Sequence, residues 1–167
     1  MSRAFVKEPD GDMAGDAQLD LPQSPHPNYV TAAGQAELGT RLAELEDRRR
    51  HLSASEDLAD KLPLTQVDRD IRYVKGRIES AIPVDAADQP DGEVCFGAIV
   101  GVADETEAVA EYTIVGEDEA DAEQGKVSWV SPLAQALQGA QVGDVITWKR
   151  PSGDIELEVI SINHSGD

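Results

Sequence analysis

Apolar residues between positions 29 and 82 recur at the spacing of an α-helix. The first stripe, with steps of four, three and seven residues, is Leu38, Leu42, Leu45 and Leu52. The second stripe, with steps of three and four residues, is Leu64, Val67, Ile71, Val74 and Ile78. Neither stripe can be buried by its own helix, so the pattern predicts two antiparallel helices packed stripe to stripe. The polar segment 53–61 is predicted to be the turn of this helical hairpin.

The pattern changes from helical spacing to alternation after residue 92. Near the C-terminus, Ile155, Leu157 and Val159 alternate with glutamates at the positions between them. Such alternation predicts strands with one buried face and one face in water. The predicted strands cover residues 93–102, 109–115, 126–130, 144–149 and 155–162.

A short helix is predicted between the third and fourth of these strands. Ser131 suits the N-cap of that helix, Pro132 suits its first position, and Gly139 suits its end. Strands with one packed helix give residues 93–163 the pattern of an antiparallel sheet in an α+β domain. The predicted fold class is therefore α+β, with an N-terminal helical hairpin (29–82), a linker (83–92) and a C-terminal β-rich domain.

Residues 1–28 show neither pattern. Aspartate and glycine are frequent there, and Pro22, Pro25 and Pro27 disfavour a helix. Because few apolar residues are available to anchor this segment, we expect a mostly disordered acidic tail.

Charge divides the chain further. The formal net charge is −19, while residues 29–82 carry 9 basic and 10 acidic residues. Residues 83–167 carry 3 basic and 18 acidic residues, so most of the negative charge lies on the predicted β-rich domain. This excess of acid disfavours direct, sequence-specific binding to nucleic acid and favours partners with basic surfaces. The basic run Arg48, Arg49 and Arg50 is either a solvated helix flank or a contact with an acidic partner.

Several functional classes lack the residues that they need. Cys95 is the only cysteine and no Cys/His cluster accompanies it, so neither a disulfide nor a structural zinc site is expected. No stretch approaches the ~20 apolar residues of a membrane span, and the N-terminus lacks the apolar core of a signal peptide. No Ser/His/Asp pattern or phosphate-binding loop is present. We expect a cytoplasmic protein, monomeric, with no cofactor and no catalytic site of its own.

The residues after position 92 resemble the FKBP-like C-terminal domain of the Gre transcript-cleavage factors, the GreA/GreB family. The matching segments are Val94–Ala98, Tyr112–Gly116, Asp118–Asp121, Val127–Ser128, Ser131–Ala134, Val142–Asp144 and Glu156–Val159. The opening segment Tyr29–Gly34 also resembles the start of the family's helical hairpin. The resemblance covers about residues 28–162.

This resemblance implies a partner, RNA polymerase. In the family, the C-terminal domain docks on the rim of the polymerase secondary channel and the hairpin enters the channel. Acidic residues at the hairpin tip help to hold a second Mg²⁺ in the polymerase's own active site and so stimulate RNA cleavage. The docking residues that the resemblance implies here are Asp118, Glu119, Asp121, Ser131, Pro132 and Leu133. The arginine run 48–50 would be the basic surface of the hairpin.

The hairpin departs from the family pattern in two ways. The family's tip signature, Asp-Leu-x-Glu-Asn-Ala-Glu-Tyr, is not found as a string, and the hairpin is shorter by an estimated ~15 residues. At ~1.5 Å per residue over two helices, this removes roughly 10 Å of reach. Glu56, Asp57 and Asp60 at the turn are candidate tip acids or ordinary turn residues. Shortened hairpins of this kind also resemble regulators of nucleoside diphosphate kinase, which look like polymerase binders without cleavage activity.

Three functions follow as hypotheses. The first is a regulator of elongation that binds at the secondary channel without strongly stimulating cleavage. The alternative is a cleavage-stimulating factor whose tip acids share the polymerase Mg²⁺. The second alternative is a protein-interaction adaptor unrelated to polymerase.

Overall fold

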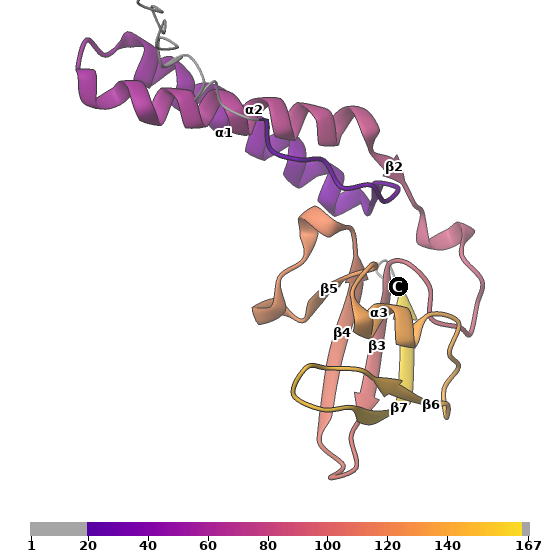
Figure 1. The fold of residues 1–167 in the computed structure, drawn as a ribbon. Helices are drawn as coiled ribbons and strands as arrows, with labels where there is room; N and C mark the ends of the chain where they lie inside the picture. The colour runs from indigo at the N-terminus through magenta and orange to yellow at the C-terminus, as the bar shows by residue number, and fades with distance from the viewer. Residues whose placement is uncertain (1–19, 165–167) are drawn as a thin grey trace, which may run out of the picture.

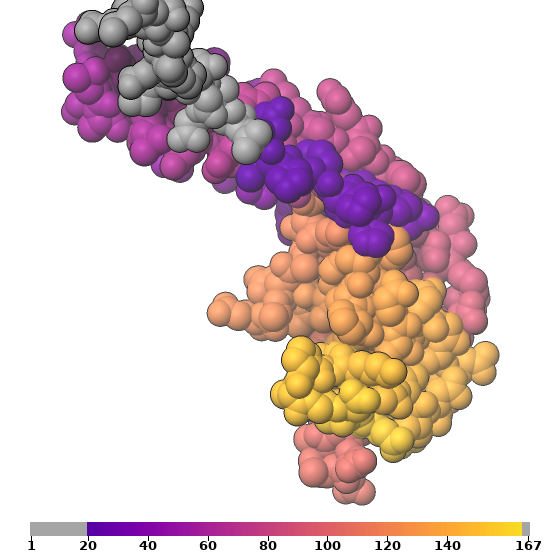
Figure 2. Space-filling model, in the orientation of Figure 1, coloured from indigo at the N-terminus to yellow at the C-terminus, as the bar shows by residue number. Residues whose placement is uncertain are grey.

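Two long helices project as an arm from a β-rich body (Figures 1 and 2). The computed structural model describes residues 20–164. Helix α1 (Ala32–Ala54) and helix α2 (Lys61–Ser80) form the arm, and a single 3₁₀ turn, η1 (Leu58–Asp60), lies at its tip. The predicted pair of antiparallel helices is confirmed.

The two predicted stripes face each other inside the arm. Thr31 caps α1 by accepting a hydrogen bond at Oγ1 from the Gly34 amide at 3.0 Å. Leu38 from α1 and Val67 and Val74 from α2 are buried. Packing these residues between the helices is what stabilises an arm that has little contact with the body beyond its base.

The body is a five-stranded sheet in the order β5-β4-β3-β7-β6. Its strands are β3 (Ala98–Ala103), β4 (Val109–Val115), β5 (Lys126–Ser128), β6 (Val145–Trp148) and β7 (Ile155–His164). The α+β class is confirmed, with one difference in the sheet: β5 pairs with β4 in parallel. The reason is the connection between them, in which two 3₁₀ turns, η3 (Glu117–Glu119) and η4 (Ala122–Gln124), return the chain to the start of β5.

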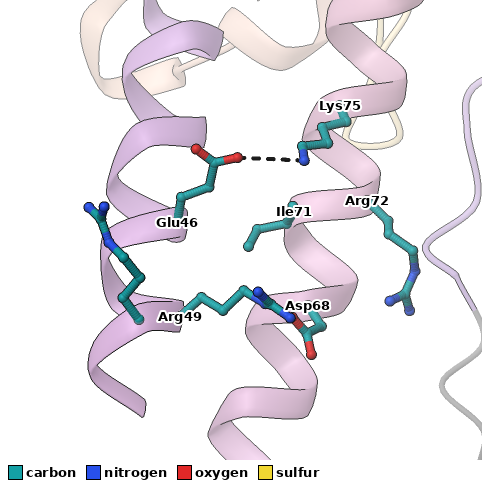
Figure 3. A pocket seen from close by; sticks show the side chains of 7 residues that line it. Glu46, Arg49, Asp68, Ile71, Arg72 and Lys75 are labelled. Atoms are coloured by element: carbon teal, nitrogen blue, oxygen red, sulfur yellow. Dashed lines mark hydrogen bonds and ion pairs between the residues drawn. The ribbon is translucent and has the colours of Figure 1, made fainter. Parts of the chain in front are cut away.

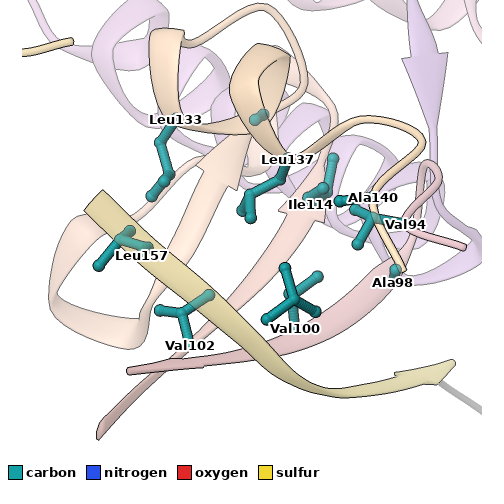
Figure 4. Packing of buried hydrophobic residues seen from close by; sticks show 11 residues of the cluster. Val94, Ala98, Val100, Val102, Ile114, Leu133, Leu137, Ala140 and Leu157 are labelled. Atoms are coloured by element: carbon teal, nitrogen blue, oxygen red, sulfur yellow. The ribbon is translucent and has the colours of Figure 1, made fainter. Parts of the chain in front are cut away.

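Helix α3 (Pro132–Leu137) covers one face of this sheet (Figure 4). Ser131 caps it by accepting from the Ala134 amide, Pro132 occupies the first turn, and Gly139 follows its end with φ of 78°. Leu133 and Leu137 enter the core of the body. The other large members of this core are Val94, Val100, Val102, Ile114, Leu157 and Val159.

The base of the arm is closed by two short strands. β1 (Tyr29–Val30) enters the arm and β2 (Ile82–Pro83) leaves it, and the two pair in parallel. The Ile82 amide donates to the Asn28 carbonyl at 2.8 Å, and the Val84 amide donates to the Val30 carbonyl at 3.0 Å. A fourth 3₁₀ turn, η2 (Ala86–Asp88), lies in the connection to the body.

Most of the predicted tail, residues 1–19, lies outside the described residues. Residues 20–28 are described, and they contact both the arm and the body. The His26 ring packs edge-on against Trp129 with centroids 5.9 Å apart, and Tyr29 packs against the same indole at 5.0 Å. Within residues 20–164, no helix combines the length and the apolar character needed to cross a bilayer.

Cys95 should react slowly with thiol reagents. Its side chain is buried, with Sγ 3.2 Å from His164 Nε2. Burial is the main cause that raises the pKa of the thiol, and the negative charge of Glu93 raises it further. A raised pKa leaves less thiolate at pH 8, and the thiolate is the reacting species. We expect iodoacetamide at pH 8 to modify the folded protein at least about tenfold more slowly than the guanidinium-unfolded protein, followed by mass spectrometry. Equal rates would show that the thiol is accessible.

Candidate functional site

A buried arginine joins the arm to the body. The Arg77 side chain, on α2, is 2% exposed. Its Nε donates to Asp118 Oδ2 on η3 at 2.6 Å, and its Nη2 donates to Asn28 Oδ1 at 2.6 Å. The Glu117 carboxylate lies 3.7 Å from the same Nη2. Burying a guanidinium group is costly unless such partners accept its hydrogen bonds. Because the N–H donors of the guanidinium lie in one plane, they also fix the orientation of those partners.

Two further hydrogen bonds complete this junction. Asn28 Nδ2 donates to the Arg77 carbonyl at 2.7 Å. The Asn28 side chain therefore hydrogen-bonds both the backbone carbonyl and the guanidinium of Arg77. The Tyr73 hydroxyl donates to Asp118 Oδ1 at 3.0 Å. Burial, and then the hydrogen bond to Asp118, raise the pKa of the Tyr73 phenol. The phenol therefore stays protonated and remains a donor at neutral pH.

Glu119 forms a second contact between η3 and the first turn of α1. Its carboxylate is mostly buried and accepts from the Thr31 amide at 3.2 Å, the Gly116 amide at 3.1 Å and the Thr31 hydroxyl. Gly34 is what allows this approach, because a Cβ built there would lie 2.0 Å from Glu119 Cδ. The arm is thus held to the body at two places, one on each helix. We call these two contacts, around Arg77 and Glu119, the junction.

The tip of the arm carries three acids. Asp57 Oδ1 accepts from the Ala59 amide at 2.9 Å and so caps η1. Glu56 and Asp57 are exposed, while Asp60, at the start of α2, is half-buried. Within residues 20–164, no three acidic, histidine or cysteine side chains lie close enough together to hold a metal ion.

The tip also exposes apolar side chains. Leu58 and Leu62 are 74% and 65% exposed, unlike the leucines inside the arm. Leu58 belongs to η1 and Leu62 to the first turn of α2, so both leucines lie at the tip with the three acids. The tip is therefore an amphipathic surface.

A charged groove runs between the two helices of the arm (Figure 3). Its volume is about 630 Å³, and its lining residues are Glu46, Arg49, Arg50, Asp68, Ile71, Arg72 and Lys75. Arg49 donates to Asp68 at 2.5 Å, and Lys75 faces Glu46 at 3.5 Å across the groove. We call this feature the basic groove, because four of its lining residues are cationic and two are anionic.

The rest of the arginine run extends this basic surface. Arg50 pairs with Asp47 on its own helix, and Arg48 is exposed. Such exposed pairs stabilise little and can exchange partners readily.

Comparison with known proteins decides the family. The model described as "Transcription elongation factor, GreA/GreB, C-term" matches residues 89–164. Transcription elongation factor GreA of Pseudomonas putida is 34% identical over 151 residues, covering 89% of each chain. The chain belongs to the GreA/GreB family. Transcription elongation factor GreB of Neisseria meningitidis serogroup B is 33% identical, over 82% of this chain and 94% of that protein.

The chain also matches a solved structure. The crystal structure of GreA factor homolog 1 (Gfh1) of Thermus thermophilus is 22% identical and matches 83% of this chain and 99% of that one, with a TM-score of 0.39.

The six residues to which the GreA/GreB resemblance assigns docking occupy three places in the structure. Asp118 and Glu119 belong to the junction with the arm. Asp121 caps η4 by accepting from the Glu123 amide at 3.0 Å. The remaining three residues lie at the start of α3, where Ser131 is the N-cap. Leu133 is buried in the core, with 2% of its surface exposed, while Pro132 is exposed. Their role in docking stays a prediction, and Pro132 is the member of the α3 group whose side chain lies at the surface.

Part of the GreA/GreB tip signature is present after all. The segment Asp57-Leu58-Ala59-Asp60 has the initial Asp-Leu pair and an acid at the fourth position, although the following residues differ. A search for the whole string misses this partial match, in which two residues are identical and the fourth is Asp where the signature has Glu. The structure places it at η1, the end of the arm farthest from the body (Figure 1).

Arg77 and Asn28 are not among the site residues predicted from the sequence. The available signal was the position of Arg77, three residues after Val74 and therefore on the apolar side of α2. A cation at that position indicates a buried partner elsewhere in the chain.

Proposed function

We propose that this GreA/GreB family member regulates transcription elongation by binding RNA polymerase at the secondary channel. The body would dock at the channel rim and the arm would enter the channel. In this proposal the protein acts as a monomer, reads no nucleic-acid sequence and catalyses no reaction itself. The observation that carries the proposal is the junction, which fixes the direction of the arm relative to the body.

A fixed arm is what such a role requires. Helix α1 has 23 residues, a length of about 34 Å at 1.5 Å per residue. Over that distance, a small rotation at the base would displace the tip by several ångströms. The buried Arg77–Asp118 ion pair on α2 and the hydrogen-bonded Glu119 carboxylate at α1 resist that rotation, because each contact loses its geometry when the helix turns.

We further propose that the protein does not strongly stimulate RNA cleavage. One carboxylate oxygen of Asp57 already accepts a hydrogen bond from a backbone amide, and the Asp60 side chain is half-buried. The arm is expected to be shorter by roughly 10 Å than the arm of the family. A metal ligand must be placed far more accurately than such a difference in length allows. Cleavage stimulation remains a second candidate, because Glu56 and Asp57 are exposed and the Asp57–Asp60 spacing follows the family's tip signature.

A backtracked elongation complex separates these functions. We expect the protein to bind bacterial RNA polymerase, measured by fluorescence anisotropy, and to change the rate of RNA 3′-end cleavage by less than about twofold. The double substitution Asp57→Asn/Asp60→Asn should leave that rate unchanged. Asp85→Asn is the matched control, because Asp85 caps η2 by the same contact, to the Ala87 amide at 3.0 Å, outside the arm.

Two outcomes would contradict the proposal. Cleavage accelerated tenfold or more, lost in the tip variant and kept in Asp85→Asn, would establish the cleavage-stimulating candidate. Absence of polymerase binding would leave the interaction adaptor as the remaining function.

A further inference from the structure

The chain immediately before the arm begins on the surface of α2. The Asp20 carboxylate accepts from Arg72 Nε at 2.6 Å, and Figure 3 shows the Arg72 side chain pointing away from α1. Gln23 lies against Gly76, where a Cβ would be 3.1 Å from Gln23 Nε2. We call residues 20–27 the strap, and Figure 1 shows this indigo segment beside the arm.

The middle of the strap contacts the body. The Ser24 hydroxyl donates to Glu117 Oε1 on η3 at 3.0 Å, and it accepts from the His26 amide at 3.2 Å. The His26 ring packs edge-on against Trp129, with the two ring centroids 5.9 Å apart. The strap therefore contacts the arm at its start and the body at its middle.

The strap is longer than its contacts with the arm require. Asp20 and Asn28 contact α2 at Arg72 and Arg77, positions that are about 7.5 Å apart along the helix axis. The chain between Asp20 and Asn28 can span roughly 27 Å when it is extended. The extra length is what allows the strap to reach the body between its two contacts with α2.

Prolines stiffen the strap before it binds. Pro22, Pro25 and Pro27 fix their own φ angles, and each restricts the preceding residue to extended conformations. The strap accordingly contains neither helix nor strand. A chain with few accessible conformations loses little entropy when it is held in one path. The prolines that disfavour a helix here therefore favour an ordered strap.

The strap also lies over the buried arginine of the junction. Residues 23–28 line a single groove of about 550 Å³ together with Gly76 and Arg77. Glu117 connects the two, because its Oε1 accepts from Ser24 and its Oε2 lies 3.7 Å from Arg77 Nη2. Ion pairs are stronger where water is excluded. By covering Arg77, the strap therefore strengthens the attachment of α2 to the body.

The contacts that hold the strap are individually weak. The side chains of Asp20 and Arg72 are 72% and 45% exposed, and such exposed ion pairs stabilise little. His26 is exposed, while Ser24 is half-buried. The strap can therefore leave the surface without unfolding either the arm or the body.

We propose that the strap is a releasable fastening that restricts the orientation of the arm relative to the body. While it is bound, the strap joins the two parts and keeps water from Arg77. When it is released, the arm turns more freely about the junction. The inference concerns one chain alone, so it stands or falls separately from the proposed polymerase function.

Two matched variants of the full chain test the proposal. The strap variant removes the contacts with both parts by the substitutions Asp20→Asn, Ser24→Ala and His26→Ala. The control changes the same kinds of side chain within α1, by Asp47→Asn, Thr40→Ala and His51→Ala. In the wild type, those three side chains contact only α1, through Arg50 and the carbonyls of Asp47 and Ala36.

Amide hydrogen exchange, followed by nuclear magnetic resonance, reports on the junction. The Thr31 and Gly116 amides donate to Glu119 in the other contact of the junction, and neither donates to the strap. We expect both amides to exchange at least about fivefold faster in the strap variant than in the wild type or the control. Amides in the middle of α1 and β3 should change by less than about twofold, because neither part unfolds.

Residual dipolar couplings give an independent readout of orientation. We expect the couplings of the two arm helices and of the sheet to fit one common alignment tensor in the wild type and the control. In the strap variant they should require two tensors.

Three results would each overturn the proposal. The first is equal exchange at Thr31 and Gly116 in the strap variant and the control. The second is equal acceleration throughout the arm and the body, because the strap would then support general stability and not orientation. The third is one common alignment tensor for all three proteins.

Discussion

Replacing Arg77 with methionine should lower the free energy of unfolding by about 3–5 kcal/mol, the range found when one partner of a buried ion pair is removed. The substitution keeps an apolar stem in the space but leaves the Asp118 carboxylate, 10% exposed, without its cation. It also removes the donor to Asn28 Oδ1. Urea denaturation followed by circular dichroism measures this loss.

Arg50→Met is the matched control for this prediction. Arg50 also pairs with an aspartate, but its side chain is 75% exposed. We expect that variant to lose less than about 1 kcal/mol. Adding Asp118→Asn to Arg77→Met should restore part of the stability, because the unpaired buried charge is then gone. If Arg77→Met cost no more than the Arg50 control, Arg77 would not be a principal contact of the junction.

Gly34→Ala should be destabilising, by about 1–3 kcal/mol, although alanine favours a helix more than glycine does. The new Cβ would lie 2.0 Å from Glu119 Cδ and 2.4 Å from its Oε2. The carboxylate must then move and lose hydrogen bonds from the Thr31 and Gly116 amides. The same urea titration measures the change.

Gly39→Ala, on the same helix, should have the opposite sign. A Cβ at Gly39 meets nothing within 4 Å, so only helix propensity changes, and we expect a gain of about 0.5–1 kcal/mol. In a Glu119→Ala background, Gly34→Ala should cost almost nothing more, because the atoms in its way are absent. Equal effects of Gly34→Ala with and without Glu119 would show that this side chain does not determine the close approach.

The helices and strands were predictable because each has a local signature. The apolar stripes set the pairing of α1 with α2, and alternation located β4 and β7 to within two residues at each end. Capping chemistry located α3, since Ser131 and Pro132 have their preferred positions. These features depend on residues that are neighbours in sequence.

The junction was not predictable because it depends on partners that are far apart in sequence. Asn28, Arg77 and Asp118 come from three separate segments. Only Arg77 has a local signal of burial, its position on the apolar side of α2, and that signal does not say which residues are its partners. Asp118 and Glu119 were expected to meet an external partner, and the structure shows that their carboxylates contact the arm of the same chain. An acidic run is equally compatible with both environments until the fold brings a cation or an amide to it.

Because β1 and β2 pair in parallel at the base of the arm, the length of the arm can change in evolution without a change in the body. Because the chain enters and leaves the arm side by side, whole heptads can be inserted into both helices without altering the residues at their base. Each such insertion would extend the arm by about 10 Å. Relatives with arms of different lengths can therefore share one body, and the distance from the body to the tip is set by insertion and deletion alone.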